Sequence, residues 1–127
     1  MVLAVVDDLM FTSRIRAAAN AAGATVVFAR SSQAALAQMK QTPPALVIFD
    51  LDNPRTDPIG TIAAMNADRA LAGVPTLGFV SHVHAELIGR ARDAGIGDVL
   101  ARSAFTIDLA EIMKRAAGAA TTPPPPR

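Results

Sequence analysis

Short runs of apolar residues recur along the chain and are separated by longer stretches of mixed character. The runs occupy residues 2–6, 25–28, 46–49, 76–80 and 99–100, and each run indicates a β-strand. The first run is continuously apolar and stops at an aspartate, which is typical of a strand that is buried on both faces. The third run is the most strongly apolar, so we expect it to be the central strand.

The stretches between these runs carry apolar residues at helical spacing. In the first stretch Phe11, Ile15 and Ala19 fall on one side of a helix, and Gly23 allows the left-handed turn with which helices commonly end. A strand followed by a helix, five times over, predicts an α/β fold: a doubly wound parallel sheet with helices on both faces. The expected helices cover about residues 10–22, 32–40, 85–94 and 107–117, and a further one follows the loop around Pro58 and ends near residue 70.

The length and composition fit one domain of ordinary size. The chain has 127 residues, and the 51% that are apolar can fill a single hydrophobic core. We expect this domain to span residues 1–118. Residues 119–127 are expected to form a disordered proline-rich tail, because a run of prolines has no capacity to pack.

Charge and hydropathy exclude several classes of function. The formal net charge is +1, and the 12 basic and 11 acidic side chains are spread along the chain, so nucleic-acid binding is not expected. No apolar stretch approaches the roughly 18 residues that a membrane-spanning helix needs. The first apolar run is too short for a signal peptide, so we expect a cytoplasmic protein. The absence of cysteine excludes disulfides and thiolate metal sites.

Three aspartates follow predicted strands at points that a parallel sheet brings together. Asp7 and Asp8 come after the first strand and Asp50 after the third, and ligands of such sheets bind beyond the carboxyl ends of the strands. Carboxylates at close range repel one another unless a cation lies between them, and oxygen ligands favour Mg²⁺. A carboxylate beside such an ion can attack phosphorus and form an acyl phosphate. The alternative is that these acids cap helices or lie solvated in loops.

The order of these motifs resembles the receiver domain of two-component response regulators, over about residues 2–117. Residues 3–8 are similar to that family's first strand and acidic pair. Residues 46–51, followed by Pro54 and Asp57, are similar to its third strand and phospho-acceptor loop. The resemblance implies a flavodoxin-like receiver fold, with five parallel strands in the order 2-1-3-4-5 flanked by five helices.

The resemblance also implies the chemistry of the site. Asp50 would accept a phosphoryl group from a histidine kinase or a phosphotransfer protein. Asp8 and Asp50 would bind Mg²⁺ directly, helped by the backbone carbonyl of Asp52, and Asp7 would act through a water molecule.

The second half of the chain departs from the family pattern. Counted from Asp50 without gaps, the family's hydroxyl residue after the fourth strand falls on Val80, with Ser81 one place later. Valine cannot donate a hydrogen bond to a phosphoryl oxygen, and Ser81 could replace it only after a one-residue shift that reverses side-chain direction. The family's lysine falls on Arg102, whose planar donor group is larger than an ammonium. The family's aromatic switch residue becomes Val99.

Three functions remain open on this basis. The first is a stand-alone receiver that is phosphorylated at Asp50, with Arg102 or Ser81 responding to the phosphoryl group. The second is a pseudo-receiver, a protein-interaction module that does not depend on phosphate. The third is a phosphatase of the haloacid-dehalogenase type, because Asp50 and Asp52 match its DxD motif. That motif usually follows the first strand and precedes Gly-Thr, whereas here two strands come before it and Asn53-Pro54 comes after it.

A receiver acts by binding partners, so we do not expect an enzyme beyond self-phosphorylation and dephosphorylation at Asp50. The family's usual partner surface, made by the fourth helix, fifth strand and fifth helix, is where a downstream protein would bind. A homodimer would use the same surface.

Overall fold

The computed structural model describes residues 1–81 and 84–121, with side chains as far as Gly118. Residues 122–127, which make up most of the expected tail, lie outside the described part. One parallel sheet runs through the molecule in the order β2-β1-β3-β4-β5, which confirms the predicted order. Its strands are β1 (Val2–Val5), β2 (Val26–Ala29), β3 (Leu46–Asp50), β4 (Thr76–Val80) and β5 (Asp98–Ala101).

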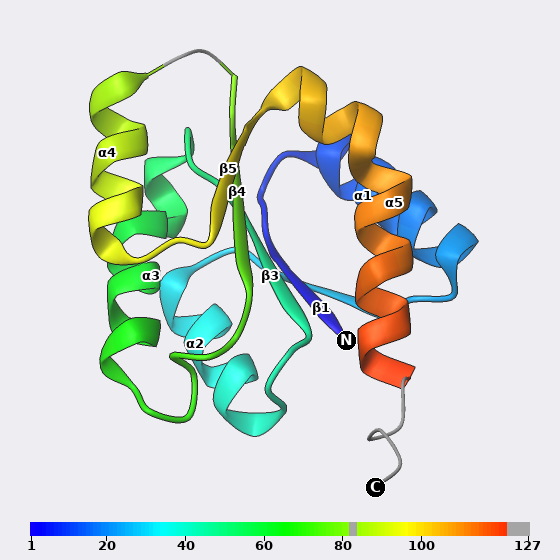
Figure 1. Cartoon of the computed structure of the whole chain (residues 1–127), viewed down its shortest axis with the longest axis horizontal. Helices are drawn as coiled ribbons and strands as arrows, with labels where there is room; N and C mark the ends of the chain where they lie inside the picture. Colours follow the sequence, from blue (N-terminus) through cyan, green and yellow to red (C-terminus); the bar gives the residue numbers. More distant parts are fainter. Residues whose placement is uncertain (82–83, 122–127) are drawn as a thin grey trace, which may run out of the picture.

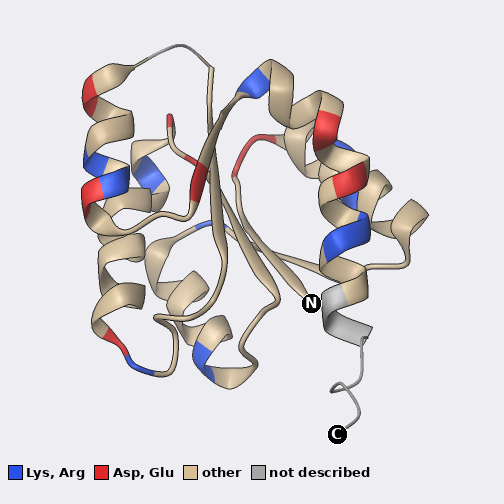
Figure 2. Ribbon diagram, in the orientation of Figure 1, with Lys and Arg blue, Asp and Glu red and all other residues tan. Residues whose placement is uncertain are grey.

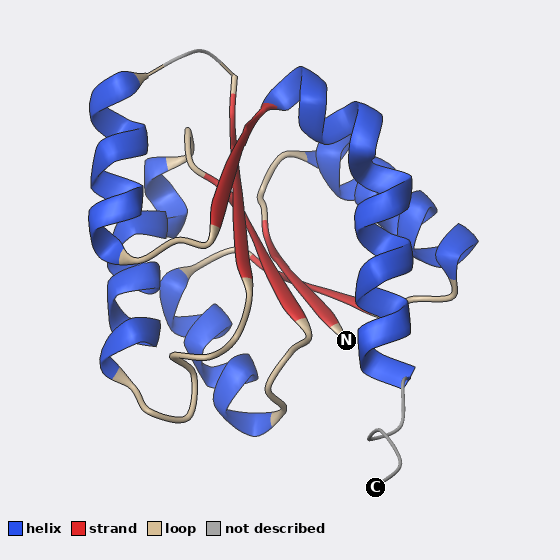
Figure 3. Ribbon diagram, viewed as in Figure 1, coloured by secondary structure: helices blue, strands red, loops and turns tan. Residues whose placement is uncertain are grey.

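Helices cover both faces of this sheet, as Figures 1 and 3 show. They are α1 (Leu9–Ala22), α2 (Ser32–Gln41), α3 (Pro58–Ala67), α4 (Ala85–Ala94) and α5 (Arg102–Thr121), with a short 3₁₀ helix, η1 (Pro54–Thr56), after β3. The predicted doubly wound fold is therefore confirmed. Among the helices of the described residues, none is long and apolar enough to cross a membrane.

Two helix boundaries differ from the sequence-based expectation. α5 begins at Arg102, directly after β5, and continues to Thr121. Its first turn could not be recognised from the apolar pattern, because Phe105 is its one fully buried residue. α3 ends at Ala67, before the expected end near residue 70. The carboxylate of Asp68 accepts a hydrogen bond from the N–H of Ala70 at 2.9 Å, which stabilises a turn in place of further helix.

The alternation of side chains along the strands gives the sheet two hydrophobic layers. Leu3 and Val5 of β1 face a core that includes residues of α2, α3 and α4. Val2 and Ala4 face the opposite core, which is completed by α1 and α5. Figure 1 shows α1 and α5 side by side on one face. Because central strands are buried on both faces, their carboxyl ends are held in fixed positions relative to one another.

Three phenylalanines from different elements stack in the core between the sheet and the α1–α5 pair. The ring centroids of Phe11 (α1) and Phe79 (β4) are 4.9 Å apart, and those of Phe79 and Phe105 (α5) are 4.5 Å apart. All three side chains are buried. This aromatic stack joins α1, β4 and α5 just below the edge where the strands end.

We expect the aromatic stack to contribute strongly to stability. Phe105→Ala should lower the free energy of unfolding by about 3–5 kcal/mol, because it removes a fully buried ring and leaves a cavity. Urea unfolding followed by circular dichroism measures the loss. Ile107→Ala on the same helix is the control: Ile107 is 80% exposed, and its loss should change stability by less than about 0.5 kcal/mol. Equal losses in the two variants would contradict this assignment.

Candidate functional site

Asp50 occupies the end of β3, in the middle of the sheet. It is 5% exposed, and within the described residues it is the one charged side chain that is buried. Its Oδ1 accepts a hydrogen bond from the backbone N–H of Asp52 at 3.0 Å. The predicted phospho-acceptor thus lies where the topology places a ligand site, at the carboxyl ends of the strands.

Burial raises the pKa of the Asp50 carboxyl above its ordinary value. Loss of solvent is the largest cause, the N–H of Asp52 lowers the pKa, and the negative charges of Asp52 and Asp8 raise it. The positive charge of Arg102 lowers it. Since the raising causes outweigh the lowering ones, the folded protein disfavours the charged form of Asp50, mainly through the loss of solvent.

The acidic pair after β1 lies at the same edge of the sheet, but both carboxylates have other partners. Asp8 caps α1: its Oδ1 accepts hydrogen bonds from the N–H groups of Met10 at 2.8 Å and Phe11 at 3.2 Å. Asp7 forms an ion pair with Arg55 of η1, with 2.8 Å between Oδ2 and Nη2. In this structure the carboxylate of Asp8 therefore caps α1, which was the alternative to metal binding.

Within the described residues, no group of three or more acidic or histidine side chains is gathered closely enough to hold a metal ion. The donor chemistry nevertheless fits a hard cation, since the carboxylates of Asp8 and Asp52 both raise the pKa of Asp50. The α1 cap uses Oδ1 of Asp8 and the ion pair with Arg55 uses Oδ2 of Asp7, so each carboxylate has a second oxygen that these two interactions do not use. The ligand set of Asp7, Asp8, Asp50 and the Asp52 carbonyl therefore stays a prediction.

The side chain of Asp52 connects the loop after β3 to the loop after β4. Its Oδ2 accepts a hydrogen bond from the backbone N–H of Ser81 at 2.5 Å. The Nε2 atom of His84, at the start of α4, lies 4.0 Å from Asp52 Oδ1. In the receiver interpretation, sequence reasoning gave Asp52 only a backbone-carbonyl role, because its side-chain partner lies 29 positions further along the chain.

The two residues considered for the family's hydroxyl position lie at the end of β4 and directly after it. Val80 ends β4, pairs with Ala101 of β5 and is 2% exposed, so no hydroxyl group stands at this position. Ser81 follows directly, and its backbone N–H is engaged by Asp52. Val99 is half-buried in β5 and packs against the core that α2, α3 and α4 cover.

Arg102 is half-buried, and within the described residues it forms no ion pair. Its Cζ lies 4.8 Å from the centroid of the Phe11 ring, a cation–π contact. Its Nε is buried, and within the described residues it has no hydrogen-bond partner. The acids at this edge have other partners: Asp7 pairs with Arg55, and the Nε2 atom of His84 lies 4.0 Å from Asp52. Figure 2 shows the basic start of α5 and the acidic loops after β1 and β3 at the same edge of the sheet.

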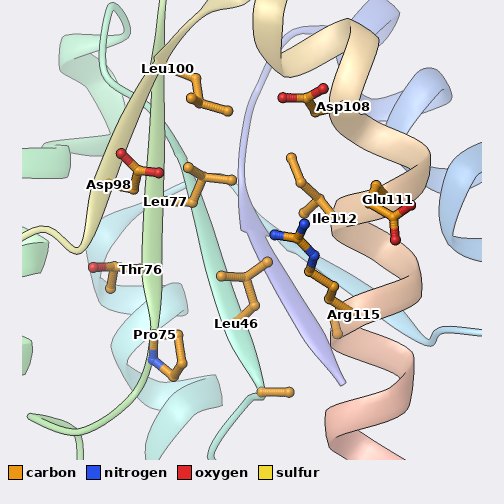
Figure 4. Close-up of a pocket in the computed structure, with 12 residues that line it drawn as sticks. Leu46, Pro75, Thr76, Leu77, Asp98, Leu100, Asp108, Glu111, Ile112 and Arg115 are labelled. Carbon is orange, nitrogen blue, oxygen red and sulfur yellow. The ribbon is translucent and has the colours of Figure 1, made fainter.

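A separate hollow of about 480 Å³ lies between α5 and the first residues of β3, β4 and β5 (Figure 4). Leu46, Leu77 and Ile112 are among its apolar residues, and Asp108 and Glu111 of α5 are among its acidic ones. It is lined mainly at the amino ends of the strands, so it lies away from Asp50 and is not part of the acidic site.

Comparison with known proteins identifies the fold. No family model matches the sequence, and no curated protein matches it either. Among solved structures, a response regulator from Hahella chejuensis is similar over 95% of both chains, with a TM-score of 0.81 and 20% identity. The phosphorylated cyanobacterial phytochrome response regulator RcpA matches 99% of this chain and 97% of its own, with a TM-score of 0.77 and 21% identity.

The Mn²⁺-bound response regulator Rcp1 matches 99% of this chain and 98% of its own, with a TM-score of 0.75 and 17% identity. At such identities the likeness establishes the fold and not the activity. The chain has the fold of a response-regulator receiver domain.

Proposed function

We propose that this chain is a receiver domain of two-component signalling that accepts a phosphoryl group on Asp50. The observation that carries the proposal is the burial of this carboxylate among other acids. A buried charge is unfavourable unless it is paired, and no ion pair within the described residues includes Asp50. Such a cost is expected where the group serves a reaction rather than the fold.

The proposed reaction transfers a phosphoryl group from a phosphohistidine of the donor protein to Asp50. A carboxylate oxygen of Asp50 attacks the phosphorus, an O–P bond forms and the N–P bond breaks, so that the donor's imidazole leaves. Oδ1 is held by the N–H of Asp52, which leaves the lone pairs of Oδ2 for the attack. Hydrolysis of the acyl phosphate by water restores the carboxylate. We propose no turnover of a metabolite.

The residues that would hold Mg²⁺ are Asp8, Asp50 and the backbone carbonyl of Asp52, with Asp7 acting through water. When bound, the ion would neutralise the phosphoryl oxygens and the surrounding carboxylates. The structure of Rcp1 is of a Mn²⁺-bound form, which supports the binding of a divalent ion by a domain of this fold. We further propose a cytoplasmic protein whose partners are a histidine kinase or phosphotransfer protein and a downstream target that binds α4, β5 and α5. A homodimer through that surface would compete with the target.

A second candidate is a pseudo-receiver that binds its partner without phosphate. The observations that favour it are the capping of α1 by Asp8, the Asp7–Arg55 ion pair, and the absence of a hydroxyl group at Val80. Nothing in the site favours the haloacid-dehalogenase alternative, since the carboxylate of Asp52 accepts the N–H of Ser81 rather than facing an open acid–base position.

Amide NMR distinguishes the two candidates. In the presence of Mg²⁺, beryllofluoride should shift the amides of Asp8, Asp50 and Val80 in the wild type, because it mimics a phosphoryl group on the carboxylate. The same titration of Asp50→Asn should leave these amides unchanged. A wild type that responds to neither millimolar Mg²⁺ nor beryllofluoride would exclude the phospho-receiver and leave the pseudo-receiver.

The raised pKa of Asp50 predicts how its replacement affects stability. Below the pKa of an unfolded aspartate, wild type and Asp50→Asn both bury a neutral group and should be similarly stable. As pH rises from the pKa of an unfolded aspartate to the raised pKa of folded Asp50, the wild type loses stability relative to the variant, because ionisation is easier in its unfolded state. Above the raised pKa the difference is complete and stays constant.

At neutral pH this advantage should be about 1 kcal/mol, a rise of a few degrees in Tm. Thermal unfolding between acidic and neutral pH measures it, with the exposed Asp108→Asn as control. An Asp50→Asn variant that is less stable than the wild type at neutral pH would show that the charge stabilises the fold.

A further inference from the structure

The hollow between α5 and the sheet leaves part of an apolar face uncovered. Its volume of about 480 Å³ lies within the range of roughly 300–1,000 Å³ that ligand sites in proteins have. Its apolar floor is made by Leu46, Leu77, Leu100 and Ile112. All of these pack in the core between the sheet and the α1–α5 pair, but Leu46, Leu100 and Ile112 are only partly buried there. Figure 4 shows Leu77 and Leu100 pointing from the sheet towards α5.

The charged residues around this floor are mostly acidic. Asp98 comes from β5, Asp108 and Glu111 come from α5, and Arg115 of α5 supplies a positive charge. All four side chains are exposed. Among the residues that the structure describes, none of the four takes part in an ion pair, although Glu111 and Arg115 are one helical turn apart. The rim of the hollow therefore has an excess of negative charge.

This charge determines which kind of occupant fits. The phosphates of nucleic acids and anionic lipids would be repelled by the carboxylates. A second copy that docked through the same hollow about a two-fold axis would bring two acidic rims together. A small molecule in so exposed a site would keep much of its surface in water, whereas ligand sites bury most of the ligand. A protein segment with a basic side chain beside an apolar one matches both the rim and the floor.

The hollow is separate from the acidic site and extends beyond the partner surface expected for the family. It lies mainly at the amino ends of the strands, whereas Asp50 lies at the carboxyl end of β3. Its described lining includes the first residues of β3 and β4 and no residue of α4. Binding there would need neither Mg²⁺ nor a phosphoryl group, so it is independent of the function proposed for Asp50.

We propose that this hollow binds a short segment of a partner protein in which an apolar side chain lies next to a lysine or arginine. The apolar side chain packs against Leu77, Leu100 and Ile112. The basic group pairs with the carboxylates of Asp108 and Glu111. The charge of Arg115 opposes the incoming cation, so two residues of the same helix act on binding in opposite directions.

The test uses the full, unphosphorylated chain as bait for a library of random heptapeptides displayed on phage. The recovered peptides should contain lysine or arginine next to a large apolar residue. A recovered peptide, synthesised and added to the methyl-labelled protein, should shift the methyl resonances of Leu77, Leu100 and Ile112 in NMR spectra. Its affinity should fall as the salt concentration rises, because exposed charges are screened.

Two variants measure the sign of the electrostatic effect on that peptide. Glu111→Gln should weaken binding about threefold and Arg115→Gln should strengthen it about threefold, as is typical of exposed charge pairs. Glu86→Gln is the matched control. Glu86 is also an exposed glutamate on a helix, but it belongs to α4, on the other face of the sheet (Figure 1), so its replacement should leave the affinity unchanged.

Several outcomes would overturn the proposal: no peptide is recovered, the recovered peptides lack a basic residue, the shifts fall outside the hollow, or Arg115→Gln weakens binding. The peptide-free protein tests two other occupants. Methyl shifts in the hollow that depend on protein concentration would assign it to a second copy. Nuclear Overhauser contacts with residues 122–127 would assign it to the same chain. Either result would overturn a partner segment, and none of them bears on phosphorylation of Asp50.

Discussion

The buried carboxylate at the end of β3 is the constraint on which the arrangement of this edge of the sheet depends. β3 lies between β1 and β4, so a side chain at its end has little access to water. Loss of solvent and two neighbouring carboxylates oppose a charge on Asp50, while one backbone N–H and Arg102 favour it. The edge therefore has an excess of negative charge, which suits the binding of a cation and a phosphoryl group together.

Two arginines supply positive charge to this edge in different ways. Arg55 is 79% exposed, and its ion pair with Asp7 is of a kind worth about 0–1 kcal/mol, so a metal ion could displace it at small cost. Arg102 lies against a ring, and its buried Nε has no acceptor among the residues that the structure describes. The first arginine partly neutralises Asp7, and the second lowers the pKa of Asp50 without forming an ion pair with it within the described residues.

The fold was predictable because it depends on local patterns. Alternating strands and helices, with right-handed crossovers, allow few arrangements, and this was enough to place Asp7, Asp8 and Asp50 at one edge of the sheet. The partners of these side chains were not predictable in the same way. Asp8 could bind a metal or cap α1, and both options fit its position before a helix.

Contacts between residues far apart in the chain were the least predictable part of the site. The Arg102–Phe11 contact, the Ser81–Asp52 hydrogen bond and the Arg55–Asp7 ion pair each join separate elements. They depend on side-chain directions that a periodic pattern does not specify. Sequence reasoning assigned Arg102 to the position of the family's lysine, but it could not anticipate that a ring would be its partner.

The most direct test of the central claim is to locate a phosphoryl group on the intact chain. The protein would be incubated with acetyl phosphate and Mg²⁺, treated with borohydride to trap the acyl phosphate, and mapped by mass spectrometry. The account predicts that one residue, Asp50, is modified, that the modification requires Mg²⁺, and that Asp50→Asn is not modified. A chain that stays unmodified, in an experiment in which a receiver of known activity is phosphorylated, would contradict the account.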